Sequence, residues 1–146
     1  MNGAQALIES LKQEQVEHIF GYAGATICPL ADTLREHPEI RYTLVRTEQN
    51  AGHMASGYAR ISGKVGVCMV TSGPGATNLI TGIATAYMDS IPLVVITGQV
   101  PTDALGSDAF QESDMTGITL PIVKHSYLVK DAADIPATIA QAYHIA

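Results

Sequence analysis

The apolar run VGVCMVT at residues 65–71 constrains the fold of this chain more than any other feature. A run that is apolar on nearly every residue is typical of a strand buried on both faces of a parallel sheet. Residues 92–98 (PLVVITG) predict a second buried strand, and residues 16–22, 41–45 and 122–129 predict three more. Helical patterns alternate with these strands, so the sequence predicts an α/β fold with a doubly wound parallel sheet and helices on both faces.

The predicted helices are marked by start and stop signals. Asn2 and Gln5 form a capping box before a helix over residues 3–14. A helix over residues 29–36 ends at His37-Pro38, because the residue before proline is pushed out of helical geometry. Gly63 ends a helix over residues 48–62, whose Ala51, Ala55, Tyr58 and Ala59 share one face. Further helices are expected over residues 76–88 and 134–146, and residues 99–120 are expected to form a long irregular loop.

Composition excludes several classes of function. The length of 146 residues favours one domain, and a charged fraction of only 15% suggests that other surfaces cover part of it. A net charge of −6 without any basic run argues against a nucleic-acid partner. Cys28 and Cys68 lie in apolar stretches and are expected to be buried thiols in a reducing compartment. With no signal peptide and no run of membrane-spanning length, the sequence predicts a cytoplasmic protein without a membrane partner.

Candidate ligand-binding residues follow three of the predicted strands. Glu48 comes after residues 41–45, and small-residue turns at residues 21–26 and 73–78 follow two other strands. The carboxyl ends of parallel strands meet at one edge of the sheet, so these three segments can converge there. Glu48 has two interpretations, a helix-capping acid or a cofactor ligand. Each turn also has two interpretations. It is either a plain strand-to-helix connection or a helix N-terminus that a flat ring or an anion approaches closely.

The familiar phosphate, metal and hydrolase motifs are missing. The turn at residues 73–78 differs from a dinucleotide fingerprint because Asn78 replaces the third glycine and Pro74 removes a backbone donor. Gly63-Lys64 continues into Val65 and so makes no phosphate-binding loop. The five histidines are dispersed without metal-ligand spacing, and no Gly-x-Ser-x-Gly elbow occurs.

Together these segments resemble the pyrimidine-binding domain of thiamine-diphosphate enzymes, and most closely that of acetohydroxyacid synthases (acetolactate synthases). The resemblance covers nearly the whole chain. It is carried by Glu48-Gln49, HMASGYAR at residues 53–60, GKVGVCMVTSGPGATN at 63–78, TGIATAYMDSIPLVVITGQVP at 81–101, DAFQE at 108–112 and VKHSYLVKD at 123–131.

The resemblance implies a role for each candidate residue. Glu48 would hydrogen-bond N1′ of the aminopyrimidine of thiamine diphosphate, and by sharing a proton there it would favour the imino form of the ring. Glu48 and Gln111 are the implied catalytic residues. Pro74, Asn78, Tyr22 and Gly24 would border the cofactor, while Phe110, Val100 and Pro101 would line the substrate channel.

The resemblance also implies that this chain is only part of an enzyme. Residues 1–146 would form a single pyrimidine-binding domain with a truncated C-terminus, since the sequence contains no Gly-Asp-Gly…Asn motif for Mg²⁺ and the cofactor diphosphate. Mg²⁺ and, where a flavin-carrying central domain is present, FAD would belong to the complete enzyme and not to this chain. The diphosphate-binding domain of a second subunit would be the partner, in at least a homodimer, and the isolated chain is expected to be inactive.

Several positions depart from the usual family pattern and leave alternatives open. Ala23, Ala25 and Thr26 stand where Pro, Gly and Ala are usual, and Thr47 and Asn50 replace His and Gly. The first interpretation remains an enzyme that decarboxylates pyruvate and joins the two-carbon unit to a second 2-keto acid, in branched-chain amino-acid biosynthesis. The alternatives are a related carboligase or decarboxylase for another 2-keto acid, and a non-catalytic assembly or regulatory subunit.

Overall fold

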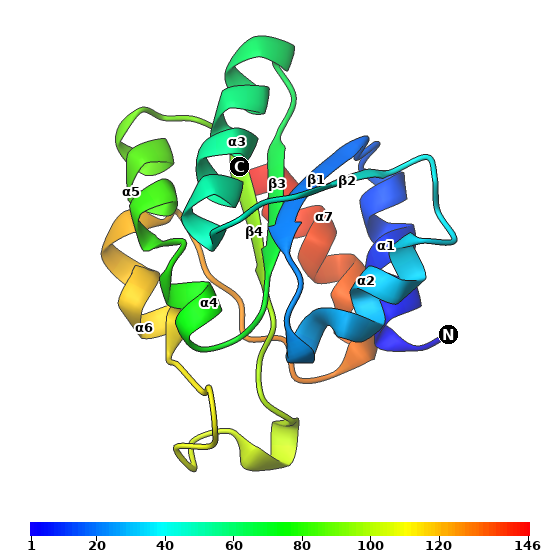
Figure 1. The fold of residues 1–146 in the computed structure, drawn as a ribbon, viewed down its shortest axis with the longest axis vertical. Helices are drawn as coiled ribbons and strands as arrows, with labels where there is room; N and C mark the ends of the chain where they lie inside the picture. Colours follow the sequence, from blue (N-terminus) through cyan, green and yellow to red (C-terminus); the bar gives the residue numbers. More distant parts are fainter.

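The fold is built on a four-stranded parallel sheet, and a computed structural model describes all 146 residues of it. The strands are β1 (His18–Tyr22), β2 (Arg41–Leu44), β3 (Gly66–Val70) and β4 (Leu93–Thr97), in the spatial order β2-β1-β3-β4. All three pairings are parallel, with Phe20 opposite both Thr43 and Cys68. The predicted doubly wound α/β fold is therefore confirmed (Figure 1).

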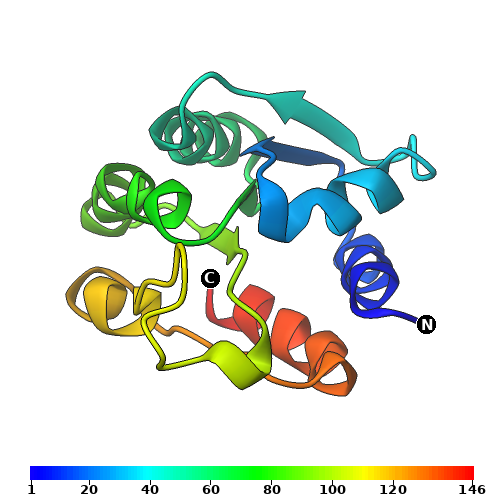
Figure 2. The same cartoon turned by 60° about the horizontal axis from the view of Figure 1, so that its bottom comes forward.

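Helices cover both faces of this sheet, as Figures 1 and 2 show. One face carries α1 (Gly3–Gln13), α2 (Cys28–Leu34) and α7 (Ile135–Ile145), and the other carries α3 (Glu48–Ser62) and α5 (Ile80–Met88). The shorter elements are α4 (Pro74–Thr77), α6 (Met115–Thr119) and four 3₁₀ turns, η1 (Ala25–Ile27), η2 (Thr102–Ala104), η3 (Leu120–Ile122) and η4 (Ala132–Asp134). No helix is long and apolar enough to cross a membrane.

The central strand β3 separates two hydrophobic clusters. All five of its residues are buried, as its apolar sequence predicts. Val67 and Met69 contribute to the cluster under α1, α2 and α7, whereas Cys68 and Val70 contribute to the cluster under α3 and α5. Burial raises the pKa of the Cys68 thiol to about 12. The small face of α3, with Ala51, Ala55 and Ala59 buried, lets this helix lie close to the sheet.

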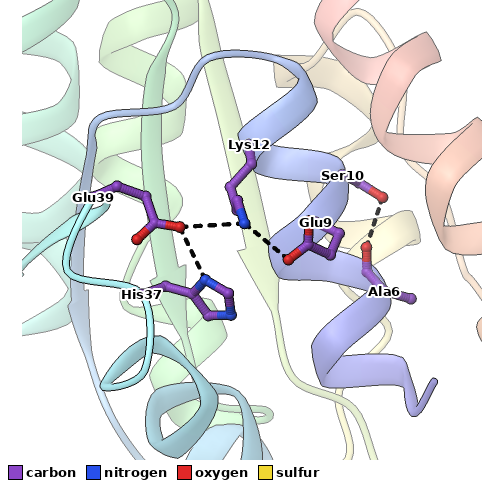
Figure 3. Close-up of polar contacts among 6 residues, drawn as sticks. All are labelled: Ala6, Glu9, Ser10, Lys12, His37 and Glu39. Carbon is purple, nitrogen blue, oxygen red and sulfur yellow. Dashed lines mark hydrogen bonds and ion pairs between the residues drawn. The ribbon is translucent and has the colours of Figure 1, made fainter.

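Local signals in the sequence match the start of α1 and the end of α3, whereas α2 ends at Leu34, before the predicted end at residue 36. The capping box of α1 forms, with Gln5 N donating to Asn2 Oδ1 at 2.9 Å and Asn2 N donating to Gln5 Oε1 at 3.0 Å. Gly63 ends α3 in the left-handed conformation with φ of 70°. Figure 3 shows how α1 is tied to the connection between α2 and β2: Lys12 lies between Glu9 and Glu39, and Glu39 also accepts from His37 at 3.0 Å.

The strand predicted over residues 122–129 is absent, which corrects the sequence interpretation. This segment lies opposite β4 across an open groove of about 1320 Å³, whose walls include Val95, Val123 and Ile139. The groove separates this segment from β4. The segment therefore has the apolar residues of a strand but no neighbouring strand to pair with. For the same reason β4 is an edge strand, and only Val94 of its five residues is buried, where the sequence predicted a buried strand.

Three smaller expectations also need correction. The helix predicted over residues 76–88 is interrupted at Asn78-Leu79 and forms two helices, α4 and α5. The loop over residues 99–120 contains η2 and α6. Cys28 is exposed, because it lies on the outer face of α2 while Leu30 and Leu34 occupy the buried face. No disulfide joins it to Cys68.

Candidate functional site

The candidate site lies where the order of the strands changes direction. The chain passes from β1 outward to β2, then returns to β3 and continues to β4 on the other side. At such a switch point, open α/β sheets bind their ligands at the carboxyl edge of the strands. Here the switch point lies between β1 and β3, at the edge of the sheet that comes forward in Figure 2. We use the word crevice for the place at this edge where Glu48 meets the turns after β1 and β3.

Glu48 brings a carboxylate into this crevice from the first residue of α3. Its Oε2 atom accepts a hydrogen bond from Asn78 Nδ2 at 2.9 Å, across 30 residues of sequence. Neither Glu48 nor the N-cap residue Thr47 makes a side-chain hydrogen bond to the first turn of α3. The carboxylate is thus directed toward another element instead of capping its own helix. Its second oxygen, Oε1, accepts no hydrogen bond within the chain.

Gly75 lies beside this free oxygen. A Cβ atom built on Gly75 would lie 3.2 Å from Glu48 Oε1 and 2.6 Å from Thr71 Cγ2, so a side chain there would force Thr71 or the turn to shift. A Cβ built on Gly24 would also lie 2.6 Å from Thr71, at its Cβ atom. The turns after β1 and β3 therefore approach each other as bare backbone around the Thr71 side chain. A side chain at position 75 would press on both Thr71 and the free oxygen of Glu48.

Asn78 lies in a different local structure from the one expected. The sequence predicted that Asn78 lies inside a helix over residues 76–88, and the resemblance places it at the border of the cofactor. In the structure Asn78 is the C-cap of α4, at the break before α5, and its side-chain amide donates to Glu48. Pro74 is exposed at the start of α4, directly after Gly73, whose φ of 58° makes the tight turn possible. Asn78 and Pro74 therefore flank the same short helix.

The loop after β4 reaches the site at one point. Gly73 packs against the backbone of Gln111, since a Cβ built on Gly73 would lie 2.5 Å from the Gln111 carbonyl oxygen. Gln111 itself has a φ of 60°, which is uncommon for a residue other than glycine. The neighbouring Glu112 accepts from the backbone N–H groups of Gly106 and Ala109, and these bonds lower the pKa of its carboxyl group. The loop is thereby held in a defined conformation.

The other proposed residues differ in exposure, and none of their side chains is hydrogen-bonded to Glu48 or Asn78. Phe110 is 88% exposed and Tyr22 is 40% exposed. Pro101 is exposed and Val100 is only 8% exposed. The structure therefore brings Glu48, Asn78, Gly24 and the Pro74 turn together. It places the backbone of Gln111 against them.

Two polar groups of the site were missed by the sequence interpretation. The Thr26 hydroxyl lies 2.9 Å from the Thr71 hydroxyl and accepts the Ser72 backbone N–H at 3.1 Å. Near the end of β1, the Tyr42 hydroxyl is buried without a partner, and burial raises its pKa to about 12. The available signal for Thr26 was a hydroxyl-bearing side chain directly after Ala23-Gly24-Ala25.

Comparison with known proteins identifies the family. Residues 1–118 match the family described as "Thiamine pyrophosphate enzyme, N-terminal TPP binding domain". The chain belongs to this family of TPP-binding domains. Thiamine pyrophosphate, or TPP, is the same compound as thiamine diphosphate.

The relatives compared below are longer than this TPP-binding domain, and each is named as an acetolactate synthase or its large subunit. The whole chain is 58% identical to part of "Acetolactate synthase" of Arthrospira platensis, of which it covers 26%. It is 55% identical to "Acetolactate synthase large subunit" of Haemophilus influenzae and 51% identical to that of Corynebacterium glutamicum, covering 26% and 23% of them. The chain thus spans about a quarter of the length of the curated relatives that it matches.

The residues of the TPP-binding domain fit one part of its cofactor. A carboxylate with one oxygen fixed by Asn78 and one free of hydrogen bonds suits hydrogen bonding to the edge of an aminopyrimidine ring. No three His, Cys, Asp or Glu side chains lie close enough together to hold a metal ion.

Proposed function

We propose that this chain is the pyrimidine-binding part of an acetolactate synthase. The complete enzyme would decarboxylate pyruvate and transfer the two-carbon unit to a second 2-keto acid. One observation carries the proposal: Glu48 is held by Asn78 at 2.9 Å through one oxygen while its other oxygen lies free beside Gly75. The names of the relatives, acetolactate synthase and acetolactate synthase large subunit, support the reaction.

The chain's own residues would bind and orient the aminopyrimidine ring. The free Oε1 of Glu48 would share a proton with the ring nitrogen N1′, and the amide of Asn78 would keep the carboxylate from rotating away. Pro74 and Gly24 would border the ring, and Tyr22 would lie at its rim. When bound, thiamine diphosphate supplies the nucleophilic carbon and the electron sink for the decarboxylation. On the substrate side, Gln111 and Phe110 would face the reacting keto acid, and Val100 and Pro101 would line the approach to it.

Other parts of the active site would come from outside this chain. The diphosphate-binding domain of a second subunit would hold Mg²⁺ and the cofactor diphosphate, so the working enzyme would be at least a dimer. FAD would bind only if the complete protein has a flavin-carrying domain. The two free cysteines fit a reducing compartment, in line with a cytoplasmic enzyme. The isolated 146-residue chain is expected to form no acetolactate.

The experiment is a Glu48→Gln substitution in the full-length protein. Glutamine keeps the size of the side chain but cannot exchange a proton with N1′. Exchange of the cofactor C2 proton for deuterium, followed by NMR, is expected to slow by about 10²–10⁴-fold, the usual contribution of a positioned acid or base. Wild-type exchange in the variant would refute the proposal for Glu48.

The matched control is Glu36→Gln. Glu36 is an exposed acid just after α2, away from the crevice, so its substitution makes the same chemical change without touching the site. Exchange in this variant should equal that of the wild type.

Acetolactate formation from pyruvate alone, compared with formation of products from other 2-keto acids, would separate an acetolactate synthase from a related carboligase.

A further inference from the structure

The hydroxyl of Thr26 joins the two turns that border the site. Thr26 lies in η1 after β1, and its Oγ1 atom accepts the backbone N–H of Ser72 at 3.1 Å. The same oxygen lies 2.9 Å from Thr71 Oγ1, across 45 residues of sequence. A hydroxyl can donate once and accept twice, so Thr26 can hold both partners at once. We call these three residues, Thr26, Thr71 and Ser72, the threonine clasp.

The Thr26 side chain is confined by the end of a third strand. A Cβ atom built on Gly98, directly after β4, would lie 1.9 Å from Thr26 Oγ1. Any residue larger than glycine at position 98 would therefore displace this hydroxyl. The ends of β1, β3 and β4 thus meet around one oxygen atom. Thr26 is an exposed residue, but on the side of β4 its hydroxyl packs against Gly98.

The clasp reaches Glu48 through the methyl group of Thr71. With its Oγ1 engaged by Thr26, the Thr71 side chain directs Cγ2 toward Gly24 and Gly75, whose built Cβ atoms would lie 2.7 and 2.6 Å from that methyl. The branched Thr side chain has few χ1 states, so fixing the hydroxyl also fixes the methyl. Gly75 in turn lies beside the free Oε1 of Glu48. A rotation of Thr71 would therefore push into the space beside the carboxylate.

We propose that Thr26 is a positioning residue for the ring-binding crevice. Its hydroxyl fixes Thr71 and the Ser72 backbone, and these set the gap between Gly75 and Glu48. Thr26 acts on the ring through these neighbours and not by touching the reacting atoms. The inference rests on the proposed function, because the crevice is taken to bind the aminopyrimidine.

The test compares three variants of the full-length protein. Thr26→Val keeps the shape of the side chain and removes the hydroxyl, whereas Thr26→Ser keeps the hydroxyl. Thr33→Val is the matched control, since the Thr33 hydroxyl bonds only the Pro29 carbonyl within its own helix at 2.9 Å. The measurements are the dissociation constant for thiamine diphosphate by calorimetry, kcat and KM for pyruvate, and the unfolding temperature.

The expected result is a defect that serine rescues. Loss of two hydrogen bonds should weaken cofactor binding by about tenfold in Thr26→Val, while Thr26→Ser stays within about twofold of the wild type. Thr33→Val should bind as the wild type does. Equal cofactor affinity in Thr26→Val and Thr33→Val would overturn the positioning role, whatever the change in unfolding temperature. A Thr26→Ser variant as weak as Thr26→Val would also overturn it.

A measurement on the unaltered protein does not depend on a folded variant. Adding thiamine diphosphate should slow hydrogen exchange at the Ser72 amide, because a bound ring holds the clasp closed. Unchanged exchange at Ser72 in the presence of bound cofactor would overturn the inference alone. Failure of the wild-type protein to bind thiamine diphosphate at all would instead overturn the proposed function, and the inference with it.

Discussion

The tight contact between Gly75 and Thr71 makes a quantitative prediction about stability. In Gly75→Ala the new Cβ atom would lie 2.6 Å from Thr71 Cγ2, about 1 Å inside ordinary contact, so Thr71 or the turn must move. Overpacking of this kind costs about 1–3 kcal/mol. For a chain of this size each kcal/mol lowers the unfolding temperature by roughly 2–4 °C, and we therefore expect a drop of about 4–8 °C for 2 kcal/mol. Thermal and urea unfolding of the purified chain, followed by circular dichroism, measure it.

A double-mutant cycle tests the cause of that loss. Thr71→Ser removes Cγ2 but keeps the hydroxyl, so in this background the nearest neighbours of the methyl group added by Gly75→Ala become Glu48 Oε1 at 3.2 Å and Thr71 Cβ at 3.7 Å. Most of the cost of Gly75→Ala, about 1–2 kcal/mol, should then disappear as a coupling energy. Gly57→Ala is the control: Gly57 lies in α3 with nothing within 4 Å of a built Cβ, and alanine there should stabilise by about 0.5–1 kcal/mol. If Gly75→Ala costs the same in both backgrounds, the steric reasoning is refuted.

Three further predictions concern other parts of the chain. A thiol reagent should modify the exposed Cys28 of the native protein but reach Cys68 only after unfolding, because burial raises the pKa of Cys68 to about 12; two rapidly reacting thiols would contradict this. The His37 hydrogen bond lowers the pKa of Glu39 from 4.5 to about 2, so its stabilising effect is complete above pH 4.5 and is lost as the pH falls toward 2; Glu39→Gln should flatten the stability curve in that window, and a parallel curve would exclude the effect. The groove beside β4 should make the isolated chain bind a hydrophobic dye such as anilinonaphthalene sulfonate in the native state, and absence of fluorescence below the unfolding transition would argue for a closed groove.

The sequence predicted the layers of the fold because its signals are local. The apolar run at residues 65–71 and the small face of residues 48–62 correspond to a buried strand and a packed helix almost residue for residue. The parallel-sheet rule then predicted that Glu48 and the two turns meet at one edge. It could not predict that Asn78 turns toward Glu48, because side-chain direction depends on the break between α4 and α5.

The failures have a physical reason in common. A strand at residues 122–129 needs a neighbour as well as apolar residues, and the pattern of one segment says nothing about its neighbour. The clasp likewise depends on two threonines 45 residues apart, which have no periodic signal. Cys28 differs, since its spacing from Leu30 and Leu34 does place it on the outer side of α2; its apolar neighbours misled the interpretation.

The strand order has a consequence for how the site comes into being during folding. The polar pairs of the crevice, Thr26 with Thr71 and Glu48 with Asn78, span 45 and 30 residues, and both depend on β3 pairing with β1 beyond its neighbour in sequence. Such non-local pairing forms slowly, because closing the long loops costs chain entropy before any stabilising contact has formed. Partly folded chains would therefore have helices but no binding crevice. A cofactor that recognises only the finished crevice would stabilise the complete fold and no earlier state.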